Sequence, residues 1–209
     1  MINLIHGDCM EYMATLKDNE FDLAVVDPPY GINYSGQKLF ISNTNTKHNR
    51  KYHKDKGWDS KRPSKEYFDE LRRVSKNQII WGGNYFADFL PASRGWCVWD
   101  KIQKGLTMSD GELAWTSYKI PLRIFEGGRH LLKGSIHPTQ KPIQLYQWIF
   151  DNYAQKGWRI LDTHLGSGSS AIAAHDCGLE FVGLELDGDY FQAAKERLET
   201  HQRQLQFPW

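Results

Sequence analysis

The sequence predicts an α/β fold with a largely parallel sheet and helices on both faces. Strand-sized apolar runs alternate with helical segments along most of the chain. A length of 209 residues suits one domain, and 40% apolar with 24% charged residues is a globular composition. We therefore expect a single folded domain over residues 1–209, not a disordered or coiled-coil chain.

The expected elements begin with two strands around a short helix. An apolar strand over 2–6 leads to Asp8, whose side chain suits the N-cap of a helix over 10–16. A buried strand over 21–26 stops at Asp27-Pro28-Pro29, because two consecutive prolines cannot continue a strand. The first 26 residues therefore predict a strand, a helix and a second strand.

The middle of the chain continues with a helix over 64–74, preceded by Pro63, and a strand over 78–81 closed by two glycines. Further strands are expected over 96–99, 112–115 and 122–125. Pro142 then opens a helix that runs to about residue 153. These segments extend the predicted sheet beyond its first two strands.

The last part shows the alternation most clearly. A strand over 159–161, a glycine-rich turn, a helix over 169–177 and a strand over 181–184 follow one another. An amphipathic helix over about 189–199 follows. Its inward positions are Tyr190, Ala193, Ala194 and Leu198. This succession predicts parallel strands joined by helices.

The composition excludes several classes of protein. Cys9, Cys97 and Cys177 are too widely spaced for a disulfide framework or a Cys-x-x-Cys zinc site. Apolar runs fall far short of the roughly 18 residues of a membrane helix, and the polar start at Met1 is not typical of a signal peptide. We expect a cytoplasmic protein without membrane attachment or a bound metal.

Basic residues concentrate in a segment at about 33–62. It holds eight Lys or Arg residues against two acids, although the whole chain carries a net charge of +1. It lacks helical or alternating periodicity, so we expect a loop of about thirty residues, a length that is usually functional or disordered. Arg50, Lys51 and Lys54 suit phosphate contacts, and Trp58 suits stacking or wedging between bases. A solvated surface insertion is the alternative.

A glycine-rich segment over 162–170 lies between a predicted strand and a predicted helix. Gly166 and Gly168 would let a ligand approach the backbone, and the helix offers free N–H groups. Glu185 follows Gly166 by nineteen residues, at the end of the next strand, where a carboxylate can accept both hydroxyls of a ribose. The pattern indicates a cofactor of the nucleoside type.

Two cofactors fit this pattern. Gly166-x-Gly168-x-x-Ala171 satisfies the loose dinucleotide fingerprint. Asp162, however, would face a pyrophosphate unfavourably, whereas its carboxylate suits the ammonium of an amino acid. The residues therefore favour S-adenosylmethionine over NAD, and a glycine-rich turn without a ligand is the third interpretation.

A second motif, Asp27-Pro28-Pro29-Tyr30, ends the strand over 21–26. The prolines fix a rigid bend whose carbonyls are free acceptors, next to a carboxylate and an aromatic ring. An exocyclic amine on a planar base would donate to the acceptors and stack on Tyr30. A turn without further function is the alternative.

Together these motifs resemble the β-type DNA amino-methyltransferases, which modify adenine N6 or cytosine N4. Residues 27–30 match the catalytic motif of that family, and 162–170 match its cofactor motif, Asp-Pro-Phe-x-Gly-Ser-Gly-Thr, in the β-type order. Residues 137–142 resemble a third cofactor element, and 7–9 resemble the opening segment. The resemblance spans nearly the whole chain. Thr163-His164 departs from the usual Pro-Phe, and Ser169 replaces Thr.

The resemblance implies a Rossmann-like, S-adenosylmethionine-dependent methyltransferase fold and a reaction on double-stranded DNA. It assigns catalysis to Asp27, Pro28, Pro29 and Tyr30, and cofactor contacts to Asp8, Cys9, His137, Thr139, Lys141, Asp162, His164, Gly166, Ser167, Gly168, Ser169 and Glu185. The target base must be flipped out of the duplex. Asp at the first motif position is commoner among the adenine enzymes, so adenine N6 is expected.

Several alternatives stay open. The chain could methylate cytosine N4, act on RNA or a protein amide, or bind DNA and cofactor without catalysis. A short insertion at about 99–130, which carries Lys101, Lys104, Arg123 and Arg129, is the second candidate for reading DNA. The recognition sequence, the choice between monomer and homodimer, and the existence of a partner restriction enzyme, as in restriction-modification, are not determined by the sequence.

Overall fold

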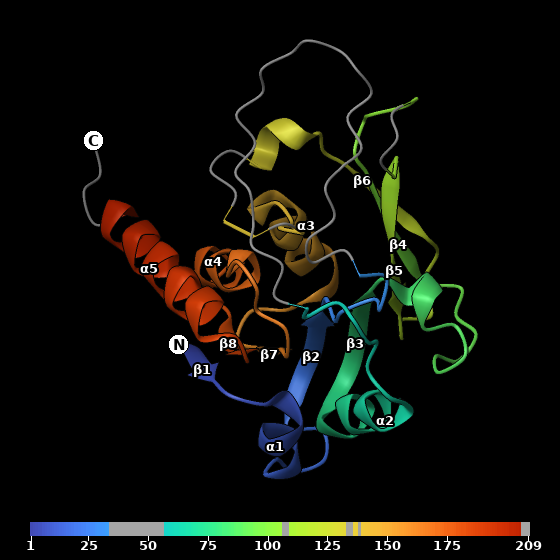
Figure 1. Ribbon diagram of the computed structural model, residues 1–209, viewed down its shortest axis with the longest axis horizontal. Helices are drawn as coiled ribbons and strands as arrows, with labels where there is room; N and C mark the ends of the chain where they lie inside the picture. Colours follow the sequence, from blue (N-terminus) through green and yellow to red (C-terminus); the bar gives the residue numbers. More distant parts are fainter. Residues whose placement is uncertain (34–56, 106–108, 133–135, 138, 206–209) are drawn as a thin grey trace.

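The computed structural model describes residues 1–33, 57–105, 109–132, 136–137 and 139–205. Its eight strands form one sheet in the order β1-β8-β7-β2-β3-β5-β4-β6 (Figure 1). The strands are β1 (Ile2–His6), β2 (Phe21–Val26), β3 (Ser75–Trp81), β4 (Trp96–Asp100), β5 (Gly111–Thr116), β6 (Arg123–Glu126), β7 (Arg159–Asp162) and β8 (Glu180–Glu185). The helices are α1 (Cys9–Ala14), α2 (Lys65–Val74), α3 (Ile143–Tyr153), α4 (Ser169–Asp176) and α5 (Gly188–Leu205), with short 3₁₀ turns η2 (Gly83–Tyr85) and η3 (Arg129–Leu132).

The sheet is mostly parallel. Strands β1, β8, β7, β2 and β3 run parallel to one another, and β4 runs parallel to β6. Only β5 is antiparallel to the strands beside it, β3 and β4, among the pairings of the described residues. The prediction of an α/β fold with a largely parallel sheet is confirmed.

Helices cover both faces of the sheet, and the side-chain alternation of β2 shows why. Leu23 and Val25 point into a core shared with α3, α4 and α5. Ala24 and Val26 point into a second core shared with α1 and α2 (Figure 1). Because successive side chains of a strand point to opposite faces, a continuous apolar run is the pattern of a strand buried on both sides.

The predicted elements are all present, with different ends. Asp8 caps α1 as predicted, since its Oδ1 accepts hydrogen bonds from the amides of Met10 and Glu11 at 2.7 and 3.2 Å. Strand β3 begins at Ser75, three residues before the predicted start, because its polar first half pairs with β2. Helix α5 continues to Leu205, beyond the predicted end near 199.

The segment predicted as a short insertion at about 99–130 takes part in the sheet. It contains β5 and β6, and β5 lies between β3 and β4. Within the described ranges, no helix is long and apolar enough to cross a membrane.

Candidate active site

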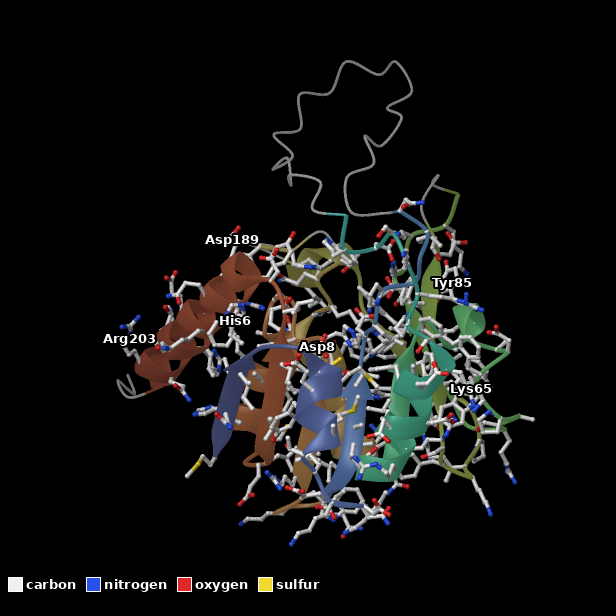
Figure 2. All side chains as sticks on the ribbon, turned by 60° about the horizontal axis from the view of Figure 1, so that its bottom comes forward. His6, Asp8, Lys65, Tyr85, Asp189 and Arg203 are labelled. Atoms are coloured by element: carbon white, nitrogen blue, oxygen red, sulfur yellow. The ribbon has the colours of Figure 1, made fainter. Side chains whose placement is uncertain are left out.

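The carboxyl ends of β1, β8, β7 and β2 lie next to one another and border one cavity. Asp8, Asp27 and Glu185, which each end one of these strands or follow it within two residues, line this cavity of about 510 Å³. In the view of Figure 2, Asp8 lies between Asp189 on α5 and Tyr85 on η2. Open parallel sheets bind ligands at this edge, and the volume lies within the roughly 300–1,000 Å³ of small-molecule sites.

Most of the predicted site residues meet at this cavity. Those that line it are Asp8, Cys9, Asp27, Pro29, Trp58, His137, Thr139, Lys141, His164, Gly166, Ser167, Ser169 and Glu185. Pro28, Tyr30, Asp162 and Gly168 are not among the lining residues of the part of the chain that the structure describes. The predicted phosphate contacts Arg50, Lys51 and Lys54 lie outside the described residues.

Glu185 is fixed by the loop that it faces. Its Oε2 accepts a hydrogen bond from the Gly166 amide at 2.8 Å, and its Oε1 accepts one from the Asp187 amide at 3.0 Å. Burial raises the pKa of the Glu185 carboxyl, and these amide hydrogen bonds offset part of the rise. The carboxylate is thus held in place at the cavity wall, where the prediction puts ribose hydroxyls.

The glycine-rich loop depends on glycine at one position in particular. Gly168 has φ +73°, and a Cβ there would lie 3.1 Å from the Cβ of Ala194 on α5. Any side chain would therefore strain the backbone and crowd α5. Arg197 of α5 also holds the loop, since its Nη1 donates to Ser167 O at 2.8 Å and to Ser169 Oγ at 2.9 Å.

Asp162 lies behind this loop and not on its ligand side. Its side chain accepts hydrogen bonds from the His164 amide at 3.0 Å and from Ser170 Oγ at 2.6 Å, and the residue is 1% exposed. Burial raises the pKa of Asp162 to about 7. The structure therefore shows Asp162 shaping the loop, and its contact with an ammonium group stays a prediction.

The unusual Thr163-His164 pair forms a polar anchor. Thr163 Oγ1 lies 2.6 Å from the Tyr67 hydroxyl on α2 and 2.9 Å from His164 Nδ1. Burial lowers the pKa of His164 to about 4, so its ring is neutral at neutral pH. These hydrogen bonds fasten the loop to α2 and replace the apolar packing expected of Pro-Phe.

The Asp-Pro-Pro-Tyr bend is held by a residue that sequence reasoning did not select. Asp59 Oδ1 accepts hydrogen bonds from the amides of Tyr30 and Gly31 at 2.7 and 2.9 Å. Asp59 is 2% exposed. It belongs to the predicted basic loop, so the described end of that loop is tied to the motif.

Asp27 already has two partners. The Tyr30 hydroxyl donates to Asp27 Oδ1 at 2.7 Å, and the Lys141 ammonium pairs with Asp27 Oδ2. Burial raises the pKa of the Asp27 carboxyl, and the Lys141 charge offsets part of that rise. The ring of Tyr30, predicted to stack on a base, stacks on Tyr85 instead, with centroids 4.8 Å apart and planes at 16°.

Lys141, predicted as a cofactor contact, lines the cavity and also takes part in a cluster of ion pairs. Its ammonium lies between Asp27 and Glu112, with 3.1 Å to Glu112 Oε2, and 5.1 Å above the Trp81 ring. Its side chain is 2% exposed. Glu112 also pairs with Lys101 at 2.7 Å. Sequence reasoning missed Glu112, because no motif surrounds it and only strand pairing brings β5 to the site.

Trp58, whose contact with DNA stays a prediction, lies at the cavity. Its ring lines the cavity and lies 5.2 Å from the ring of His137, which in turn lies 4.4 Å from the ring of Tyr190 on α5. Within the described residues, Trp58 Nε1 is buried without a hydrogen-bond partner. The three rings form an aromatic wall of the cavity, a surface suited to a planar ligand.

Comparisons with known proteins agree with this geometry. A family model of N6 and N4 methyltransferases, described as DNA methylase, matches residues 94–196. The Type II methyltransferase M2.DpnII of Streptococcus pneumoniae is 24% identical, over 94% of this chain and 89% of that protein.

Two solved structures share the fold. The M1.HpyAVI–SAM complex has 22% identity and a TM-score of 0.64, and the match covers 95% of this chain and 99% of that one. The PvuII DNA methyltransferase, named as cytosine-N4-specific, has 12% identity and a TM-score of 0.61, over 97% and 92% of the two chains. The predicted methyltransferase fold is confirmed, and the comparisons support the predicted resemblance to the N6/N4 DNA methyltransferases.

Proposed function

We propose that the protein transfers a methyl group from S-adenosylmethionine to the N6 amino group of adenine in double-stranded DNA. One observation carries the proposal. Asp27 lines the same cavity as Glu185 and the Gly166 loop. An acceptor for an amine and a site for a nucleoside cofactor therefore share one space, as methyl transfer between the two requires.

The cavity fits S-adenosylmethionine by the chemistry of its walls. The Glu185 carboxylate would accept the ribose hydroxyls, and the aromatic wall of Trp58, His137 and Tyr190 offers a stacking surface for an adenine. The unpaired Trp58 Nε1 is a donor for a polar atom of the ligand. When bound, the cofactor would supply an electrophilic methyl group, and the family relative M1.HpyAVI is known as a complex with SAM.

The chain's own contribution to the chemistry lies in Asp27. Its carboxylate accepts a hydrogen from the target amine and so orients the nitrogen lone pair toward the cofactor. The Pro28 carbonyl would accept the second hydrogen. Because the amine is inaccessible in a duplex, the base must leave the stack, at a cost of a few kcal/mol.

Adenine is favoured over cytosine because this motif begins with Asp27, which the resemblance associates with the adenine enzymes. A cytosine-N4 enzyme is the second candidate, since PvuII DNA methyltransferase shares the fold. A catalytically inactive relative is the third, since Thr163-His164 departs from the cofactor motif.

Incubation with labelled S-adenosylmethionine and unmethylated genomic DNA, followed by single-molecule sequencing, tests the proposal. N6-methyladenine at a defined sequence is the expected product. N4-methylcytosine would establish the second candidate. Cofactor binding by calorimetry without any transfer would establish the third, and label in RNA but not in DNA would overturn the DNA substrate.

A further inference from the structure

Four charged side chains of alternating sign run from the cavity to the end of β4. Asp27 pairs with Lys141, whose ammonium lies 3.1 Å from Glu112 Oε2, and Glu112 Oε1 lies 2.7 Å from Lys101 Nζ. Each charge thus has a partner of opposite sign. Pairing of this kind is required here, because an isolated charge in a buried site is strongly unfavourable.

Within the described residues, each oxygen of the Asp27 carboxylate already accepts one hydrogen bond. Its Oδ1 accepts from Tyr30 and its Oδ2 accepts from Lys141. Each oxygen can accept a second hydrogen bond, but a target amine that approaches Oδ2 competes with the Lys141 ammonium for that oxygen. Lys141 is the contact that can be given up at least cost, because its ammonium already has a second carboxylate at 3.1 Å.

We propose that Glu112 is a positioning residue that retains the Lys141 ammonium while Asp27 exchanges this partner for the target amine. The inference rests on the proposed methyl transfer. Without Glu112, an ammonium released by Asp27 would have only the Trp81 ring and the Tyr30 oxygen, at 3.5 Å, among its described neighbours. The exchange would then leave a buried charge without a counterion.

The charge balance supports this role. Asp27 and Glu112 together raise the pKa of Lys141 despite its burial, so the ammonium stays protonated. Lys141 and Lys101 hold the pKa of Glu112 below its ordinary range despite burial. Other titratable groups that face this cluster are Tyr30 after β2, Tyr146 on α3 and Asp162 at the end of β7.

The test compares Glu112→Gln with the parent in single-turnover methylation of DNA. We expect the rate at neutral pH to fall roughly ten- to a hundredfold, because a neutral amide holds an ammonium less well than a carboxylate does. The affinity for S-adenosylmethionine should stay within a few-fold. Glu180→Gln, an exposed change at the opposite end of β8, is the matched control and should leave the rate unchanged.

A pH profile separates this role from a structural one. Glu112 raises the pKa of Lys141, so its loss lowers that pKa. The Glu112→Gln enzyme should therefore regain rate as the pH rises and Lys141 loses its proton, a gain that the parent lacks. Glu112→Asp, which keeps the charge, should retain most of the activity, and it serves as the second variant if Glu112→Gln does not fold.

A double-mutant cycle completes the test. If Glu112 acts through Lys141, the variant Glu112→Gln/Lys141→Met should be no slower than Lys141→Met alone. Independent, multiplying losses would overturn the inference, as would a Glu112→Gln enzyme as fast as the parent. A parent protein that transfers no methyl group to DNA would instead overturn the proposed function and this inference with it.

Discussion

The Tyr30 hydroxyl donates a hydrogen bond of 2.7 Å to Asp27 Oδ1, within the same four-residue motif. This bond helps to keep Asp27 ionised, since it lowers the pKa of a carboxyl that burial raises. Tyr30→Phe removes the bond and retains the ring. We expect the rate of methyl transfer to fall roughly tenfold, in line with the loss of a hydrogen bond to a charged group.

The pH dependence of Tyr30→Phe has a definite sign. Asp27 must be ionised to accept the amine hydrogen, and loss of the Tyr30 bond raises the pKa of Asp27. Activity of the variant should therefore disappear at a higher pH than that of the parent as the pH is lowered. Profiles of kcat between pH 5 and 9 check this, and coincident acidic limbs would show that the hydroxyl does not act on Asp27.

Loss of the carboxylate itself should have the largest effect. We predict that Asp27→Ala abolishes methyl transfer and leaves the affinity for S-adenosylmethionine within a few-fold, because the carboxylate serves the base. The change should appear in kcat. A radiolabel assay and calorimetry measure the two quantities, and an unchanged turnover would remove Asp27 from the mechanism.

Much of the fold could be predicted because both faces of its central strands are buried. The runs at 23–26 and 181–184 are continuously apolar, and such runs between helices predict parallel strands. The start of β3 could not be predicted, because Ser75, Lys76 and Asn77 are polar and become a strand only through pairing with β2. Tertiary pairing outweighs local propensity there.

The site residues that belong to short contiguous motifs could be predicted from the sequence. The residues of the Asp27 and Gly166 motifs lie at strand ends, and the sheet order brings those ends together. Glu112 was not predictable, since it reaches Lys141 only through the antiparallel pairing of β5 with β3. Tyr30 and Trp58 were expected to contact DNA bases. A sequence motif does not show whether an aromatic ring contacts a base, a cofactor or another side chain.

Asp162 offers a test of stability and of binding in one variant. Burial raises its pKa to about 7 in the folded protein, against about 3.9 in an unfolded chain. A raised carboxyl pKa stabilises the fold at low pH, and this contribution is lost as the pH rises through about 7. Asp162→Asn should therefore melt at a higher temperature than the parent at pH 8, with a smaller difference at pH 5.

The same variant decides the role of Asp162 toward the cofactor. Because its side chain does not line the cavity in the described part of the chain, we expect the affinity of Asp162→Asn for S-adenosylmethionine to stay within a few-fold of the parent. A loss of roughly ten- to a hundredfold would instead support the predicted contact with an ammonium group.

The Trp58 ring should contribute more to the affinity for S-adenosylmethionine than to the affinity for DNA. Its ring lines the cavity beside His137, so Trp58→Leu should weaken binding of S-adenosylmethionine by roughly tenfold, about 1.4 kcal/mol. Trp58→Phe keeps a ring without the Nε1 donor and should lose less. Calorimetry with both variants measures this, and a loss confined to DNA affinity would favour the predicted wedge between bases.

The basic segment supplies the last prediction. Arg50, Lys51 and Lys54 are three of the eight basic residues between about 33 and 62. Each phosphate neutralised on duplex DNA contributes about −0.9 to the slope of log K against log salt. Replacing all three by Ala should therefore flatten that slope by up to about 2 to 3 units if each contacts a phosphate. The affinity for S-adenosylmethionine should hardly change, because these side chains serve the DNA. Salt titrations of the triple variant and the parent measure the slopes, and an unchanged slope with unchanged methylation would show that the segment is only a solvated surface loop.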